Sequence, residues 1–234
     1  MNQGDAATAG QLTGDTFSTG TLSFPATVPD GHEMWFGSGN APTNYNIAAD
    51  TPDNLYDALK IHVRTGADIT PSGSGPNGEQ FYNAPAGDQP GAPTRGAFNI
   101  DYVVNTGANG DTVSSADLSK YTSIMQVTGE FAGGSATADF QLNPTNHVWE
   151  DVSNPNIGFG GDDFNQPGAT AGVMSHITEN SINFGFASMQ EALGATQAQL
   201  TTAGTQFDVK LATFSGGNML SEVHDHITLV PPTV

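Results

Sequence analysis

Residues 206–230 read QFDVKLATFSGGNMLSEVHDHITLV, and this stretch sets the fold that the rest of the chain has to accommodate. Apolar and polar residues alternate on both sides of a Gly-Gly pair, as they do in strands that bury one face. A three-residue loop over 215–217 predicts an antiparallel hairpin with Val209 opposite Val223. In this hairpin Asp225 points to the apolar face, so we expect it at a sheet end or accepting hydrogen bonds.

The same period-two alternation recurs in five further segments of the chain. They are predicted to be half-buried strands, and they cover 58–64, 98–104, 121–131, 137–142 and 181–186. The chain also contains 29 glycines and 14 prolines, which favour turns and loops between strands. We therefore predict an all-β fold, an antiparallel β-sandwich of Ig-like or jelly-roll type with long Gly/Pro-rich loops.

The domain organisation follows from where the alternation starts and where it is interrupted. Residues 1–30 form a Thr/Gly-rich lead-in with one expected strand around 17–24, and residues 31–234 form a single β-sandwich domain. Residues 66–96 are almost free of aliphatic side chains, which predicts one long loop, either mobile or ordered by a ligand. One short helix is expected within 188–200.

Charge and composition exclude several classes of partner. The chain has 24 Asp and Glu against 5 Lys and Arg, a formal net charge of −19, which disfavours nucleic acid and anionic membrane surfaces. Cysteine is absent, so the chain has no disulfide and no thiolate metal site. No apolar run of about 18 residues occurs, and we expect no membrane insertion of this chain.

A row of three metal-binding residue types lies on the polar side of the last strand. Residues two apart on a strand share a face, so Glu222, His224 and His226 are neighbours, and two imidazoles so placed can bind Zn²⁺ or Cu²⁺. The alternative is a solvent-facing row without metal. In the predicted register, Glu222 then pairs with Lys210 and His224 pairs with Asp208.

Two loops are rich in oxygen ligands of the kind that Ca²⁺ prefers. Asp162 and Asp163 lie in one Gly-rich turn, and Asp111 lies in another Asn/Gly-rich stretch. Neither loop fits the EF-hand pattern, and Asp, Asn and Gly also build ordinary turns. Calcium binding at these loops is therefore one of two alternatives.

Aromatic residues offer a second kind of candidate site. Exposed aromatic rings can stack on sugars, and Trp35, Trp149 and Tyr45 are the candidates for binding carbohydrate. The alternative is that these rings belong to the core, where Trp and Tyr are common. The sequence contains no Gly-x-Ser-x-Gly, phosphate-binding loop or His-Glu-x-x-His motif, and we expect no enzyme activity.

The order of these segments resembles exported bacterial proteins of the PEP-CTERM sorting class. The resemblance covers about residues 55–230 and depends on two phrases, FNIDY at 98–102 and NSINFGF at 180–186, with Ile182 where an aromatic residue is usual. The chain stops at VPPTV, where the Pro-Glu-Pro motif of that class would come next, so the sorting tail is absent from it. The resemblance implies export and an exopolysaccharide or biofilm setting.

These observations combine into one expected function and one alternative. The first is a secreted, non-catalytic matrix or cell-surface β-sandwich, with self-association or extracellular polysaccharide as its partner and with Ca²⁺, Zn²⁺ or Cu²⁺ as a bound ion. The alternative is a carbohydrate-binding module or a glycan-active jelly-roll enzyme. Tryptophans on a concave face would favour the alternative, and tryptophans in the core would favour the first.

Overall fold

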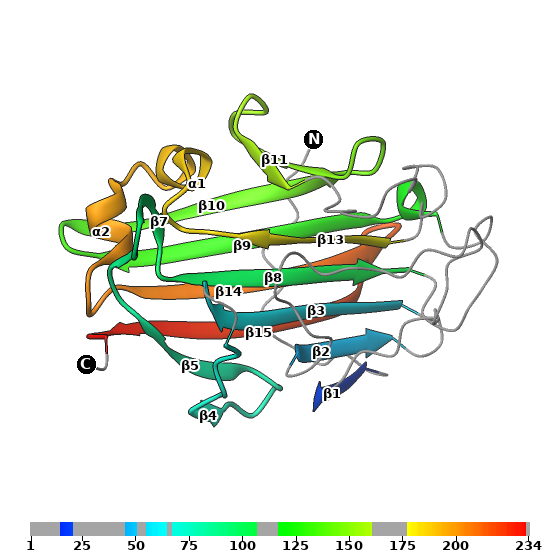
Figure 1. Ribbon diagram of the computed structural model, residues 1–234. Helices are drawn as coiled ribbons and strands as arrows, with labels where there is room; N and C mark the ends of the chain where they lie inside the picture. Colours follow the sequence, from blue (N-terminus) through cyan, green and yellow to red (C-terminus); the bar gives the residue numbers. More distant parts are fainter. Residues whose placement is uncertain are drawn as a thin grey trace.

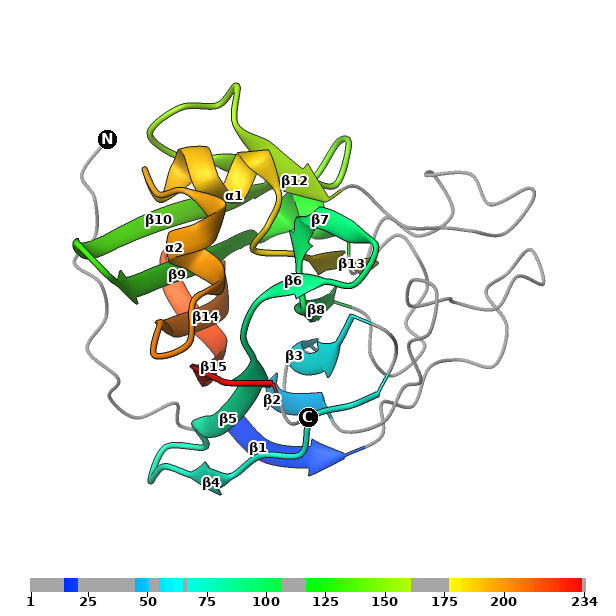
Figure 2. The same ribbon diagram turned by 60° about the vertical axis from the view of Figure 1, so that its left-hand side comes forward.

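The computed structural model describes residues 15–20, 45–50, 55–64, 67–106, 117–160 and 177–232. Within these ranges the chain forms a β-sandwich whose two main sheets have eight and five strands (Figures 1 and 2). The five-stranded sheet lies in front of the eight-stranded sheet in Figure 1. The predicted all-β sandwich is confirmed.

The eight-stranded sheet is antiparallel except where β15 meets β5. Its strands, in spatial order, are β12 (Gly158–Gly160), β11 (Val148–Asp151), β10 (Gly134–Asn143), β9 (Thr122–Phe131), β14 (Gln206–Ser215), β15 (Asn218–Val230), β5 (Gln80–Pro85) and β4 (Gly73–Ser74).

The five-stranded sheet is antiparallel throughout, and a short ribbon and short helices complete the described structure. Its strands, in spatial order, are β1 (Asp15–Gly20), β2 (Tyr45–Asp50), β3 (Leu55–Val63), β8 (Phe98–Asn105) and β13 (Ile177–Ile182). The ribbon pairs β6 (Asp88–Gln89) with β7 (Ala92–Gly96), and the helices are η1 (Leu118–Lys120), α1 (Ala187–Ala192) and α2 (Gln197–Thr201).

The core lies between the two sheets and is filled by alternate residues of each strand. On β14 and β15 the buried apolar residues include Phe207, Val209, Val223 and Ile227, each at most 2% exposed. Burial of such side chains contributes about 1.5–3 kcal/mol each. The predicted alternation is therefore confirmed for this hairpin, but β8 is buried on both faces and is not the half-buried strand that we expected.

The hairpin between β14 and β15 turns through two residues instead of the predicted three. Ser215 pairs with Asn218, which leaves Gly216 and Gly217 as the loop. Their φ angles of 57° and 85° match a type I′ turn, which needs positive φ at both positions. Glycine adopts these angles without steric cost, so the Gly-Gly pair fixes the tight turn.

The register predicted for this hairpin is wrong by two residues. An irregularity between Thr213 and Phe214 adds one residue to the ladder, and Val209 lies opposite Asp225 instead of Val223. A shift of two residues keeps every side chain on its predicted face, because the side-chain period of a strand is two. Asp225 lies within the ladder and not at a sheet end, and it is fully buried.

The predicted single long loop over 66–96 is wrong for most of its length. Residues 73–96 contain β4, β5, β6 and β7. Strand β5 adds in parallel to β15, with Ile227 opposite Tyr82 and Leu229 opposite Ala84. Tyr82 and Ala84 alternate with exposed residues on this strand, so a short buried face exists that the dense Gly and Pro content concealed.

One short helix was predicted within 188–200, and the structure has two short helices, α1 and α2, in this region. Two short helices lie at one end of the sandwich (Figure 2), and they are separated by Gly194, whose φ is 58°. A capping box joins Thr196 to Gln199. The strand predicted over 181–186 ends at Ile182 and leads into α1. Among the described residues, no helix is long and apolar enough to span a membrane.

Polar side chains connect the two sheets across the core. Asn46 on β2 donates from Nδ2 to Oδ1 of Asp225 at 2.7 Å. Asp57 on β3 accepts hydrogen bonds from Thr213 Oγ1 at 2.9 Å and from Ser221 Oγ. Each bond joins the five-stranded sheet to the β14–β15 hairpin, so directional contacts fix how the two sheets lie on each other.

The buried carboxyl group of Asp225 is only partly satisfied by these contacts. Its Oδ2 atom has no hydrogen-bond partner among the described residues. Burial raises the pKa of Asp225 to about 7, although the hydrogen bond from Asn46 acts in the opposite direction. The protonated form is therefore stabilised in the folded protein.

We predict that Asp225 makes the protein less stable as the pH rises from about 4 to about 7. Between these two pH values the folded state holds the proton of Asp225 and the unfolded chain does not. The free energy of unfolding therefore falls by roughly 4 kcal/mol across this range, and above about pH 7 it no longer changes because of Asp225. Asp225→Asn removes this dependence and is expected to be more stable than the parent at pH 8. Urea unfolding at several pH values measures how the free energy of unfolding depends on pH in the parent and in Asp225→Asn.

Asp139→Asn is the control for this experiment, because Asp139 lies on the same sheet, is part-buried and its carboxylate accepts a hydrogen bond from Gln126 Nε2 at 2.8 Å. It is expected to keep the slope of the parent. If the free energy of unfolding depends on pH in Asp225→Asn as it does in the parent, the assignment of this dependence to Asp225 is contradicted.

Candidate metal site

The candidate site lies on the outer face of the eight-stranded sheet, where β14 and β15 run side by side. His224 and His226 point outward from β15, and Asp208 points outward from β14 opposite His226. One ligand atom from each of the three residues lies within 4.8 Å of the other two. The alternation of the strands thus brings two imidazoles and one carboxylate together at the surface.

Asp208 contacts both imidazoles. Its Oδ1 lies 2.7 Å from Nε2 of His224, and its Oδ2 lies 3.0 Å from Nδ1 of His226. The two rings lie 4.2 Å apart, centroid to centroid. The side chains of His224, His226 and Asp208 are 13%, 32% and 35% exposed, so an ion can reach them from solvent.

Phe81 on β5 fixes the orientation of the second imidazole. It lies opposite His226 in the parallel ladder, and the two rings stack at 4.6 Å with an interplanar angle of 9°. On the other side of the site, a half-open groove of about 430 Å³ extends from His226 and Asp208 toward Thr128 on β9. The site is therefore walled on one side and accessible on the other.

The electrostatics keep the carboxylate charged and one imidazole neutral. Burial alone would raise the pKa of Asp208, but the hydrogen bond and charge of His224, with His226 and Lys210, hold that pKa below its ordinary value. Burial, together with the nearby charge of His224, lowers the pKa of His226, and the charge of Asp208 opposes this only in part. A neutral imidazole beside a carboxylate is the form that binds metal.

Other charges around the imidazoles favour a cation. Asp208, Glu79 and Glu222 are the carboxylates within electrostatic range, and Lys210 is the opposing ammonium group. Glu222 lies on the same row but opposite Ala212, and burial raises its pKa. The structure therefore brings Asp208, and not the predicted Glu222, to the two histidines.

This set of ligands suits Zn²⁺ or Cu²⁺. Imidazole nitrogen and carboxylate oxygen bind Zn²⁺ at about 2.0–2.2 Å, which places neighbouring ligand atoms about 3.5 Å apart. The three atoms already lie within 4.8 Å, so small rotations of half-exposed side chains close the difference. Three protein ligands leave one position for water or for a group from another molecule.

The other residues proposed from sequence lie elsewhere. Trp149 and Tyr45 are 0% exposed. Trp149 packs edge-on against Tyr102 at 5.5 Å, and Tyr45 lies beneath Lys60, so the proposed stacking of sugars on these two rings is wrong. The remaining candidates lie outside the described residues, and they are Trp35, Asp111, Asp162 and Asp163.

Two parts of the site were missed in the sequence. Asp208 was assigned only as an ion-pair partner of His224, because the predicted register was two residues off. Phe81 lies 145 positions from His226 in the chain and reaches it only through the parallel pairing of β5 with β15. The two adjacent aromatic residues Phe81 and Tyr82 near the start of the Gln80–Pro85 segment were the available signal.

Comparisons with known proteins add no assignment to this geometry. No protein-family model, no curated protein and no solved structure matches the chain. The functional argument therefore depends on the residues of the site.

We predict that His226 titrates below its ordinary pKa of about 6.5 and that Asp208→Asn lowers its pKa further. The substitution removes an attractive negative charge from beside the imidazolium form. Ring-proton NMR shifts followed from pH 4 to pH 9 measure the change, with Asp139→Asn as a control on the same sheet. A rise of the His226 pKa in Asp208→Asn would contradict the contact.

Proposed function

We propose that this chain is an exported, non-catalytic β-sandwich protein of the cell surface or extracellular matrix that binds Zn²⁺ or Cu²⁺ through Asp208, His224 and His226. The observation that supports it most directly is the convergence of these three ligands on one solvent-accessible face. The proposed exported setting rests on the resemblance to the PEP-CTERM class and on the acidic composition of the chain.

The bound ion stabilises the pairing of β14 with β15. One ligand comes from β14 and two come from β15, so the ion joins the two strands beyond their backbone ladder. An ion that binds only the folded state stabilises it by mass action, by about 2.7 kcal/mol at a free concentration of 100 times its Kd. The fourth coordination position offers a route to self-association through a ligand from a second molecule.

Calcium binding is a separate part of the proposal and involves a different region. It concerns the acidic segments of the sequence around Asp111 and around the pair Asp162 and Asp163, which lie outside the described residues. Oxygen-rich loops favour Ca²⁺, whereas imidazoles favour Zn²⁺ and Cu²⁺. The two ions should therefore not compete, which a mixed titration can test.

We predict saturable binding of one Zn²⁺ or Cu²⁺ ion per chain by titration calorimetry at pH 7.5. His224→Ala, His226→Ala and Asp208→Asn each remove one ligand and should weaken binding by more than about tenfold. Binding should also weaken as the pH falls below about 6.5, because protons compete for the imidazoles.

Two matched variants serve as controls for the titration. Thr228→Ala removes a neighbouring outward side chain of β15, and Glu222→Gln removes the carboxylate of the same row that the structure leaves out of the cluster. Thr228→Ala is expected to bind as the parent does, and Glu222→Gln, which removes a nearby charge but no ligand, should weaken binding less than the three ligand variants do. Equal, weak heats in the parent and in the three ligand variants would exclude the site.

A further inference from the structure

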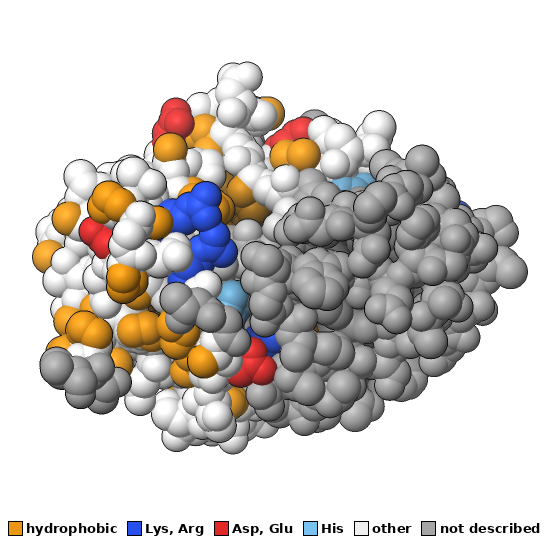
Figure 3. Space-filling model, viewed as in Figure 1, with side chains coloured by type: hydrophobic (Ala, Val, Ile, Leu, Met, Phe, Trp, Pro, Cys, Tyr) orange, Lys and Arg blue, Asp and Glu red, His pale blue; other side chains and the backbone are white. Residues whose placement is uncertain are grey.

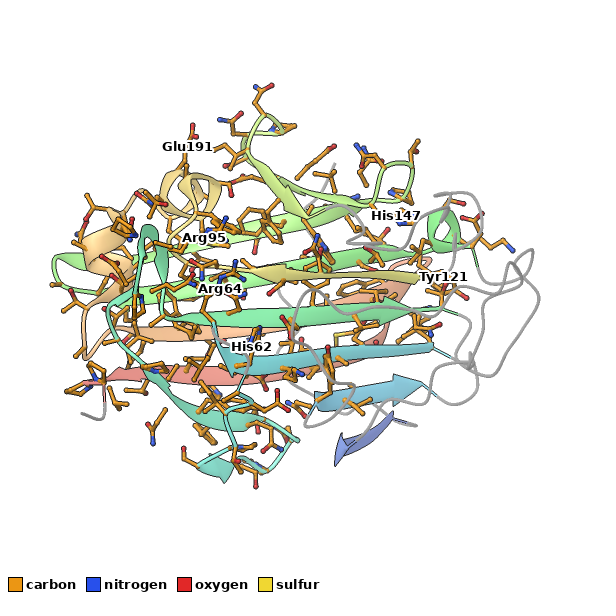
Figure 4. The ribbon with its side chains drawn as sticks, in the orientation of Figure 1. His62, Arg64, Arg95, Tyr121, His147 and Glu191 are labelled. Atoms are coloured by element: carbon orange, nitrogen blue, oxygen red, sulfur yellow. The ribbon has the colours of Figure 1, made fainter. Side chains whose placement is uncertain are left out.

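The few positive charges of this acidic protein are not spread evenly over it. Lys60, Arg64 and Arg95 are three of its five Lys and Arg residues. Figure 3 shows one larger patch of Lys and Arg side chains on this side of the molecule and a smaller, separate one beside Asp and Glu side chains, and Figure 4 places Arg64, just past β3, next to Arg95 on β7. This face is opposite to the one that carries the candidate metal ligands.

The three cations differ in their partners. Lys60 is buried and forms an ion pair with Asp68 at 3.1 Å. Within the described part of the chain, neither Arg64 nor Arg95 has a carboxylate within ion-pair distance. Asp101 is in electrostatic range of Arg64, but its Oδ1 is engaged by His62 Nε2 at 3.0 Å and by Ser181 Oγ at 2.7 Å. Its Oδ2 is buried and has no hydrogen-bond partner among the described residues, so Arg64 does not reach it.

Neutral contacts hold both guanidinium groups in place. Arg64 donates from Nε to Oε1 of Gln89 at 3.2 Å, and its Nη1 lies 2.9 Å from the amide oxygen of Asn99 in the orientation that satisfies that amide. Arg95 lies over the ring of Phe186 at 5.8 Å. Both arginine side chains are half-buried and keep further N–H groups for a ligand.

The backbone that carries Arg95 is also fixed. A Cβ atom at Gly185 would lie 2.6 Å from Cα of Arg95, so only glycine allows this close approach. Next to it, Gly96 donates from its backbone N to Oδ1 of Asn183 at 2.6 Å. The arginine pair is therefore built on packed strand and turn residues.

Two adjacent like charges are unfavourable unless an anion lies between them. Burial, together with the positive charge of Arg95, lowers the pKa of Arg64, in agreement with their proximity. Guanidinium groups bind carboxylate and phosphate oxygens through paired N–H donors, and two such groups can share one oxyanion. The chain has 24 Asp and Glu residues, and among the described residues none of them lies within ion-pair distance of Arg64 or Arg95.

We propose that Arg64 and Arg95 form a binding site for an oxyanion, the carboxylate or phosphate group of a small anionic ligand. The site is independent of the metal proposal, since it uses other residues on the other sheet. The nearest acid on the neighbouring ribbon, Asp88, accepts from Gln197 Nε2 at 2.7 Å and is thereby turned toward α2.

The test is an NMR titration of the full chain with sodium phosphate, sodium sulfate and sodium acetate at constant ionic strength, read at the Nε–Hε signals of the arginines. We expect saturable shifts of Arg64 and Arg95 with at least one anion. Arg64→Gln and Arg95→Gln should each weaken the binding by at least about tenfold, because each removes charge-assisted hydrogen bonds. A response to acetate identifies a carboxylate site, and a response only to phosphate and sulfate identifies a tetrahedral oxyanion.

Lys210→Gln is the matched control, because it changes the net charge equally but lies on the eight-stranded sheet. It should leave the titration unchanged. The proposal is overturned if no anion gives saturable shifts, or if Lys210→Gln weakens the response as much as the arginine variants do. Thermal melts of each variant show that any loss occurs in folded protein.

Discussion

The strict alternation of β15 is the constraint on which the rest of the structure depends. Its inward residues include Val223, Asp225 and Ile227, which close the core, and its outward residues include His224 and His226. A slip of one residue would bury two imidazoles and expose the apolar row, so packing of the core also fixes the candidate site. The inward face of β15 therefore belongs to the core, and its outward face carries the candidate metal ligands.

The polar links across the core add direction to this packing. Apolar contacts alone allow two sheets to slide on each other, whereas the bonds from Asn46 to Asp225 and from Thr213 to Asp57 exist in one arrangement only. Burial disfavours the charged form of Asp225, whereas the hydrogen bond from Asn46 favours it, so the two effects on the pKa of this carboxyl group act in opposite directions. The positions of β2 and β3 relative to the hairpin depend on these contacts.

Much of the fold was predictable from the sequence, because alternation reports which side chains are buried. The strands over 122–131 and 206–230 follow directly from it, whereas the strand over 98–105 was predicted as a strand but is buried on both faces. The register of the last hairpin did not follow, since it depends on the exact loop and on the irregularity at 213–214. The parallel addition of β5 was hidden for a different reason, because nothing local marks a pairing between residues so far apart.

The candidate site was predictable in part for the same reason. His224 and His226 share a face whatever the register, but the third ligand depends on which residue of β14 lies opposite. The pair Arg64 and Arg95 was not predictable, because the two residues lie on different strands or strand ends and meet only in the tertiary structure. Contacts within one strand can be derived from periodicity, whereas contacts between strands need the tertiary structure.

The most direct test of the account is X-ray absorption spectroscopy of the protein loaded with one equivalent of Zn²⁺. The account predicts a first shell with two imidazole nitrogens and a carboxylate oxygen at about 2.0–2.2 Å, together with the outer-shell scattering of two imidazole rings. The imidazole scattering should be reduced by half in His226→Ala. A shell of oxygen atoms alone, or a spectrum unchanged in that variant, would contradict the assignment of Asp208, His224 and His226 as the metal site.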